Sequence, residues 1–213
     1  MSEAALCTRR QALRGAAASA AGAASAAGAA CTGALALATA ADAVAATASE
    51  RALDVDRLTR LVRVQLLLEY CYRQVLDSSI LTPQARAAVA PFFGQVRSQV
   101  AALSAPLRAA GAAVPPGPSS VAQADRFLRR RRVGGRLGQL RGSDDALRLL
   151  LAMEQVMIGA QFVALMKLSD PELVELCARI MACGAQHDAI LRLLLPPHKA
   201  SAAAAYGLVQ GLQ

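Results

Sequence analysis

The sequence predicts an all-α domain made of two helical hairpins joined by a long connection. Apolar residues recur at three- and four-residue spacing through four segments, residues 54–78, 83–110, 144–168 and 170–195. Few β-branched runs alternate with period two, and the 213-residue chain has no tryptophan and only four phenylalanines. The links within each pair of segments are short, so we expect antiparallel neighbours, with residues 112–142 as the crossover between the pairs.

The first forty residues have the pattern of an export signal. Thr8-Arg9-Arg10-Gln11-Ala12-Leu13-Arg14 resembles the twin-arginine signal, although Ala12 stands where a bulkier residue is usual, and residues 15–41 carry no charge. Ala38-Thr39-Ala40 supplies a small-x-small cleavage pattern. We expect residues 1–40 to direct export to the periplasm or cell envelope and to be removed, which leaves residues 41–53 as a linker. The alternatives are an Ala-rich tail, or a membrane anchor long enough to cross about 30 Å of hydrocarbon.

The first two helices are predicted from their apolar faces and their ends. Residues 54–78 carry apolar side chains on two sides, as a helix inside a bundle does. Thr82 followed by Pro83 is a typical helix start, and Gly111 is a typical stop. Pro91 and Pro106 are expected to kink the second helix or to end it early, because proline lacks a backbone N–H.

The crossover is rich in proline at its start and in arginine at its end. A short helix is expected over Val121–Arg131, and Arg129, Arg130, Arg131 and Arg132 follow one another there. We expect a solvated basic loop. The alternative is weak contact with an anionic surface such as phosphate head groups. The formal net charge of +8 falls to +6 without residues 1–40, which hold three arginines and one glutamate, and is too small to indicate nucleic acid.

The last two helices each carry a polar residue in an apolar stripe. Ser143-Asp144-Asp145 is expected to cap the third helix, and Ser169 with Glu172 has the spacing of a capping box for the fourth. Glu154 interrupts the third stripe and His187 the fourth. The third stripe consists of Leu147, Leu150, Leu151, Met157, Ile158, Phe162 and Leu165. Burying a carboxylate is costly unless it is paired, so Glu154 and His187 are candidates for a site in the core.

Three motifs, in this order, resemble those of the exported bacterial ferritin-like proteins. They are Leu68-Glu69-Tyr70, Met153-Glu154-Gln155 and Gln186-His187-Asp188-Ala189-Ile190-Leu191. The resemblance covers residues 54–196 and leaves residues 197–213 as a tail. It implies a ferritin-like antiparallel four-helix bundle with a long crossover between helices two and three. It also implies a di-iron site, which takes one Glu from each of two helices and a Glu-x-x-His from each of the others.

This sequence departs from that di-iron pattern. The family's ligand positions correspond here to Glu69, Val96, Gln99, Glu154, Gly184 and His187. Only two carboxylates and one imidazole remain, which cannot hold and balance two iron ions. We therefore expect no cofactor and no catalysis. The expected function is that of a structural or interaction module with a protein or another envelope component as its partner.

Two interpretations of the remaining polar residues stay open. In the first, Glu69, Glu154, His187 and Gln99 form a buried network that fixes the helix register. In the second, Glu69, Glu154 and His187 bind a single metal ion, with Cys183 as a softer fourth ligand for zinc or copper and with weak redox activity. Cys183 is equally explained as a small buried hydrophobe. Cys71, Cys177 and Cys183 are an odd number, and the last two are about 9 Å apart along a helix, too far for a disulfide.

Overall fold

The computed structural model describes residues 32–196, with side chains from residue 47, and the regular secondary structure of this part is all helical. The elements are α2 (Thr32–Asp77), α3 (Pro83–Ala109), α4 (Val121–Arg130), the 3-10 turn η2 (Leu137–Gln139), α5 (Ser143–Leu165) and α6 (Pro171–Leu194). These residues contain five α-helices and no strand, so the all-α prediction is confirmed. The chain divides into two compact units, with the boundary between Ala45 and Ala46. The twin-arginine motif with Arg9 and Arg10, and the tail 197–213, lie outside the described residues.

Helix α2 begins earlier than the sequence pattern suggested. The expected linker, residues 41–53, is helical and continuous with the segment predicted to start at residue 54. Alanine is the strongest helix former and makes up much of this stretch, and no proline occurs between Thr32 and Asp77. The apolar pattern therefore indicated where the buried part of the helix begins, because Asp54 and Leu58 are buried. It did not indicate where the helix itself begins.

Helix α3 has the predicted ends but is not shortened by its prolines. The Thr82 hydroxyl accepts the Ala85 N–H at 3.3 Å, and Gly111 follows the helix with a positive φ of 70°. The helix runs through both Pro91 and Pro106. Each proline removes one ladder hydrogen bond, and buried neighbours such as Leu107 provide compensating contacts.

The starts of α5 and α6 differ from the predicted caps. Gly142, with no side-chain hydrogen bond, is the N-cap of α5, although Asp144 and Asp145 do lie in the first turn. Asp170 caps α6 and accepts the Glu172 N–H at 2.8 Å. Ser169 does not cap α6, because its N–H and hydroxyl both donate to Asp54 of α2. The Ser169–Glu172 capping box is therefore wrong.

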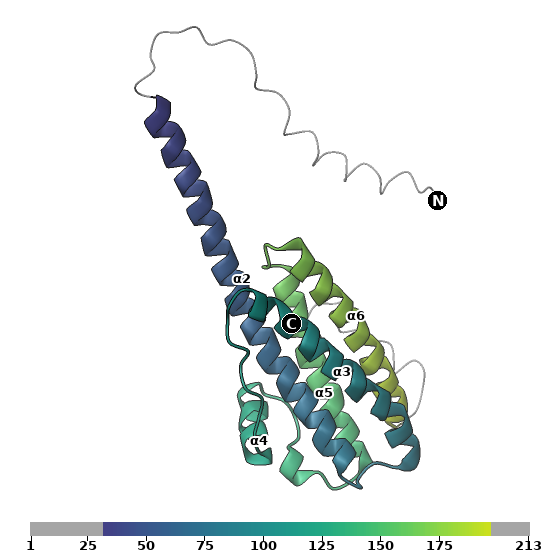
Figure 1. The fold of residues 1–213 in the computed structure, drawn as a ribbon. Helices are drawn as coiled ribbons and strands as arrows, with labels where there is room; N and C mark the ends of the chain where they lie inside the picture. Colours follow the sequence, from purple (N-terminus) through teal and green to yellow (C-terminus); the bar gives the residue numbers. More distant parts are fainter. Residues whose placement is uncertain (1–31, 197–213) are drawn as a thin grey trace, which may run out of the picture. The chain divides into compact units, whose positions relative to one another are not determined.

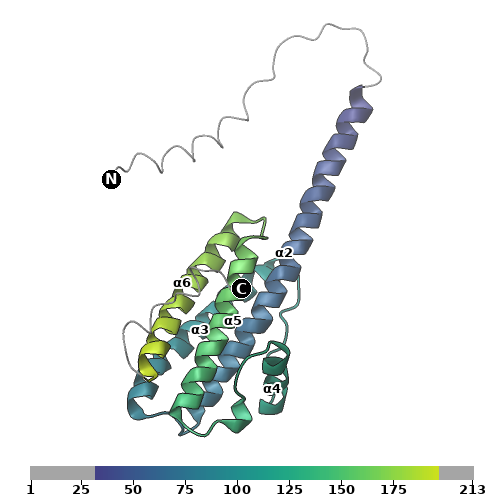
Figure 2. The ribbon, with the colours of Figure 1, turned by 180° about the vertical axis from the view of Figure 1, so that it is seen from behind.

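Helices α2, from Ala46 onward, α3, α5 and α6 lie side by side around one apolar core. Figure 1 looks onto α2 and α3, and Figure 2 shows α5 and α6 on the other side. Leu68 of α2, Val96 of α3 and Leu150 of α5 are fully enclosed in this core. The crossover passes beside it and contains α4, so the short helix expected there is confirmed.

Helix α5 has one apolar side facing outward at its C-terminal end. Phe162, placed by its spacing on the buried stripe, is 58% exposed, and Val163 and Met166 are exposed beside it. Glu154, Gln161 and Ala164 take the core-facing positions, which leaves Phe162 on the flank of the helix, about 100° around the axis from Gln161. Among the described helices, α5 is a candidate membrane span by length and composition, with half of its most apolar stretch buried in the protein.

Candidate functional site: a polar cluster in the core

The Glu154 carboxylate is buried in the middle of α5 and is paired with groups from two other helices. Its side chain is almost completely enclosed, next to Met153 and Ile158. The Tyr72 hydroxyl of α2 donates to Oε1 of Glu154 at 2.7 Å. The same oxygen lies 2.9 Å from Nδ1 of His187 on α6. Glu154 thus links three helices, and these contacts offset the cost of burying its charge.

His187 is held on both ring nitrogens and on one ring face. Its Nδ1–H donates to Glu154, and Nε2 lies 2.6 Å from Oε1 of Gln95 on α3. Phe92 stacks on the imidazole with a centroid separation of 4.2 Å and an interplanar angle of 20°. With the Gln95 amide in this orientation both nitrogens donate, as in an imidazolium paired with a carboxylate. The amide turned over would instead donate to a neutral ring.

Cys183 and Tyr72 complete the cluster, and both are protonated at neutral pH. Cys183 lies one turn before His187, with Sγ 3.6 Å from Nε2 and 3.5 Å from Oε1 of Gln95. Burial, and then the charge of Glu154, raise the pKa of the Cys183 thiol. Burial also raises the pKa of Tyr72 well above 10, as do the charge and hydrogen bond of Glu154. Tyr72 therefore remains a hydrogen-bond donor to the carboxylate.

The structure brings together Glu154, His187 and Cys183 but not Glu69. Glu69 is half-buried on α2, and no hydrogen bond or ion pair joins it to Glu154 or His187. Tyr72, one turn later on α2, reaches the carboxylate instead. Gln99, expected in the same network, accepts from Gln65 at 2.7 Å and also forms a side-chain hydrogen bond with Cys183, so it adjoins the cluster. Within residues 47–196, no three His, Cys, Asp or Glu side chains converge as metal ligands.

Gly184 marks a close approach of α6 to α5. A Cβ atom at this position would lie 3.3 Å from Oε2 of Glu154 and 3.2 Å from Cγ1 of Ile158. The resemblance places the glutamate of the family's fourth-helix Glu-x-x-His motif at residue 184. A glutamate here would crowd the Glu154 carboxylate and add a second negative charge beside it. Because Gly184 has no side chain, it leaves room for the Glu154 carboxylate that pairs with His187.

Two residues of the cluster, Tyr72 and Gln95, were not predicted as site residues. Both had a sequence signal, because Tyr72 shares a helix face with Gln65 and Glu69, and Gln95 directly precedes Val96. Val96 itself is enclosed in the apolar core. The two positions are about 100° apart around α3, so Val96 faces the apolar core while Gln95 reaches His187 of α6.

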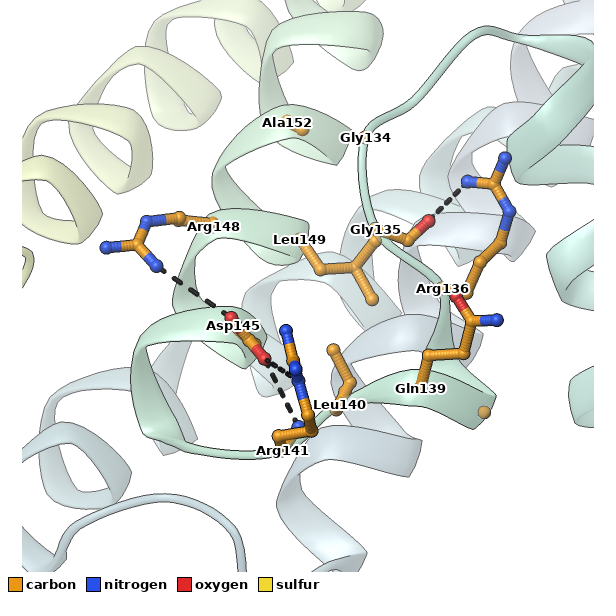
Figure 3. A pocket seen from close by; sticks show the side chains of 11 residues that line it. Gly134, Gly135, Arg136, Gln139, Leu140, Arg141, Asp145, Arg148, Leu149 and Ala152 are labelled. Carbon is orange, nitrogen blue, oxygen red and sulfur yellow. Dashed lines mark hydrogen bonds and ion pairs between the residues drawn. The ribbon is translucent and has the colours of Figure 1, made fainter.

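A separate cavity of about 840 Å³ lies between the end of the crossover and α5. Figure 3 shows that its arginines do not converge on one point. Arg136 donates to the carbonyl oxygens of Val133 and Gly135, whereas Arg141 and Arg148 both approach Asp145. Each guanidinium group thus already has a partner within the protein, either a carbonyl oxygen or Asp145, so this cavity is a weaker candidate for an anion site than the number of arginines suggests.

A second surface feature is a groove between α2 and α5, which we call the α2–α5 groove. Its volume is about 540 Å³. Its apolar residues include Leu61, Val64, Val156, Ala160 and Val163, and its charged residues are Arg57, Arg60, Arg131 and Lys167. Arg57 and Arg60 pair with aspartates on α2. Neither Arg131 nor Lys167 forms an ion pair with a described residue, so the groove has an apolar floor and a net positive rim.

The comparisons with known proteins identify a fold neighbour. No family model matches the chain, and no curated protein matches it. A crystal structure of a conserved hypothetical protein from Mycobacterium tuberculosis is similar, with a TM-score of 0.56 and 18% sequence identity. The alignment covers 67% of this chain and 96% of that one. At this level of identity the likeness shows a shared fold, which extends over nearly all of the mycobacterial protein.

Proposed function

We propose that the chain is an exported ferritin-like protein of the cell envelope in which a polar cluster replaces the di-iron centre, and that it serves as a non-catalytic interaction module. Two helical hairpins and a long crossover support the ferritin-like antiparallel four-helix arrangement. The resemblance assigns two of the family's ligand positions to Glu154 and His187, whose side chains meet at 2.9 Å. The export signal is proposed from the Arg9-Arg10 motif alone.

The proposal that the protein is non-catalytic rests on one observation. The candidate metal-ligand atoms of Glu154 and His187 are paired with each other and with neighbouring side chains. Oε1 of Glu154 meets both Tyr72 and His187, and the second ring nitrogen of His187 meets Gln95. The polar residues that α3 contributes to the site are neutral glutamines. Position 184 of α6 is a glycine and contributes no side chain. This donor set does not fit two iron ions, which need several carboxylates to balance their charge. The cluster instead ties α2, α3, α5 and α6 together.

The interaction part of the proposal is carried by the α2–α5 groove. Its charged residues are all cations, and the exposed side chains of Phe162 and Met166 adjoin Val163 on the same helix. Apolar side chains beside lysine and arginine suit the interface of an anionic bilayer, where apolar groups enter the head-group region and cations bind phosphate. We propose that an anionic lipid surface is the partner of this groove.

Elemental analysis and melting in chelator test the absence of a di-iron centre. We expect no stoichiometric iron in the purified protein, and a melting temperature that an iron-selective chelator does not change. Glu154→Gln keeps the shape and acceptor of the side chain, so its effect should stay within about 1 kcal/mol, or roughly 2–4 °C. Glu175→Gln on the exposed face of α6 is the control.

Two results would contradict this part of the proposal. One is iron at two equivalents per chain. The other is a wild-type melting temperature that falls by many degrees in an iron-selective chelator, while Glu154→Gln is insensitive to it.

A further inference from the structure

The atoms that meet on the Nε2 side of His187 belong to the polar network, and they are also of the types that bind a metal ion. Cys183 and His187 are four residues apart and share one face of α6, with their Sγ and Nε2 atoms 3.6 Å apart. Gln95 brings Oε1 to within 2.6 Å of the nitrogen and 3.5 Å of the sulfur. A thiol, an imidazole nitrogen and an amide oxygen therefore face one point between α3 and α6.

We propose that Cys183 Sγ, His187 Nε2 and Gln95 Oε1 form the binding site of one thiophilic metal ion of the zinc(II) or copper(I) class. Thiolate and imidazole favour such ions over magnesium and calcium. This site goes beyond the proposed function, because it is mononuclear and uses neither Glu69 nor Glu154 as a ligand. The two side chains that the resemblance supplies as carboxylate ligands thus lie outside it.

The spacing of the two strongest ligands fits one shared ion. An ion at about 2.3 Å from sulfur and about 2.1 Å from an imidazole nitrogen would see the two atoms, 3.6 Å apart, at about 110°. This angle is close to the tetrahedral value that zinc prefers. Gln95 is exposed and can turn its oxygen toward the ion, and solvent can supply the remaining position.

Glu154 has the role of a positioning residue in this site. It binds Nδ1 of His187, the nitrogen on the far side of the ring from Cys183. A carboxylate in that place fixes the imidazole orientation and makes the other nitrogen a better ligand, as in carboxylate–histidine–zinc arrangements. Phe92, stacked on the ring, limits its rotation further. The cluster thus presents Nε2 toward the half-exposed thiol.

Cobalt(II) titration of the reduced full-length protein, without a histidine tag, tests the site. A cobalt–thiolate bond produces a charge-transfer band in the near ultraviolet, which hydroxyl or carboxylate ligands do not give. We expect the band to saturate at one equivalent and to be displaced by zinc(II). Cys183→Ser should abolish it. Cys177→Ser is the matched control and should keep it, because Cys177 is enclosed in the core and burial raises the pKa of its thiol to about 11.

Glu154→Gln distinguishes positioning from ligation. The cobalt band should keep its shape in this variant while the affinity falls by about 10–100-fold. Thermal melting of each apo variant checks that it is folded. The absence of a band in the wild type, or its survival in Cys183→Ser, would overturn the proposal. Neither result bears on iron content, so this proposal and the proposed function can fail separately.

Discussion

At the scale of single residues, the buried carboxylate of Glu154 depends on a tyrosine that the sequence pattern had not selected. Removing the Tyr72 hydroxyl leaves Glu154 with one donor in a nearly solvent-free site. A hydrogen bond to a charged group contributes about 1.5–3 kcal/mol. We therefore expect Tyr72→Phe to lower the free energy of unfolding by about 2 kcal/mol and the melting temperature by roughly 4–8 °C.

Tyr70→Phe is the matched control for this prediction. Tyr70 is also buried on α2, and among the described residues its recorded contact is the guanidinium group of Arg73 above its ring, which phenylalanine preserves. Denaturant unfolding of both variants measures the difference. Equal losses in the two would mean that the hydrogen bond from Tyr72 to Glu154 contributes no more than the hydroxyl of Tyr70 does.

The sequence predicted part of this cluster, and helix rotation explains the remainder. Glu154 and His187 were found because each breaks an apolar stripe. Glu69 and Tyr72 lie on neighbouring positions of one helix face, and a rotation of a few tens of degrees decides which of them points inward. Phe162 was misplaced for the same reason. Periodicity shows that a helix has a buried side, whereas its centre is set by packing against the other helices.

At the scale of elements, the start of α6 is held by a residue of α2. The Asp54 carboxylate accepts the N–H groups of Ser169 and Asp170 and the Ser169 hydroxyl, the last at 2.6 Å. Thr82 and Gly111 were predicted correctly as helix ends because their partners lie nearby in sequence. Ser169 was not, because its acceptor is 115 residues away and no local motif contains it.

The Asp54 contacts predict an acid-sensitive link between α2 and α6. Burial by itself would raise the pKa of Asp54, but the hydrogen bonds from Ser169 and Asp170 outweigh it, so the folded pKa lies below 3.8. The stabilisation is therefore present above pH 3.8 and lost as the pH falls through the folded pKa. Asp54→Asn should cost about 1–3 kcal/mol at pH 7 and progressively less toward pH 3.

Unfolding in urea between pH 3 and pH 7 measures how the difference in stability between the wild type and Asp54→Asn shrinks as the pH falls. Asp56→Asn is the control, because Asp56 forms an exposed pair with Arg60 that contributes about 0–1 kcal/mol. If the curves for the wild type and Asp54→Asn stay parallel over this range, the carboxylate charge does not matter for the link.

At the scale of the whole molecule, charge and exposed apolar surface occur together beside the α2–α5 groove. The net charge of +8 attracts any anionic surface weakly, so total charge alone would give binding without a preferred face. Arg131, directly after α4 in the crossover, and Lys167, in the turn after α5, place two cations at one groove. Phe162 and Met166, 58% and 73% exposed, add apolar side chains next to it. This combination predicts a defined face for membrane contact.

Co-sedimentation with vesicles tests that face. The protein should bind vesicles rich in phosphatidylglycerol and not vesicles of phosphatidylcholine alone. Each basic residue near an anionic surface contributes about 1 kcal/mol, so Arg131→Glu with Lys167→Glu should weaken binding by roughly 30-fold or more. Arg97→Glu with Arg108→Glu changes the net charge equally on exposed positions of α3 and should cost much less. Phe162→Ser with Met166→Ser should remove the part of binding that survives high salt, because salt screens the charges and leaves apolar insertion unaffected. Equal losses in the two charge-reversal variants would instead assign the attraction to total charge and leave the groove without a role in it.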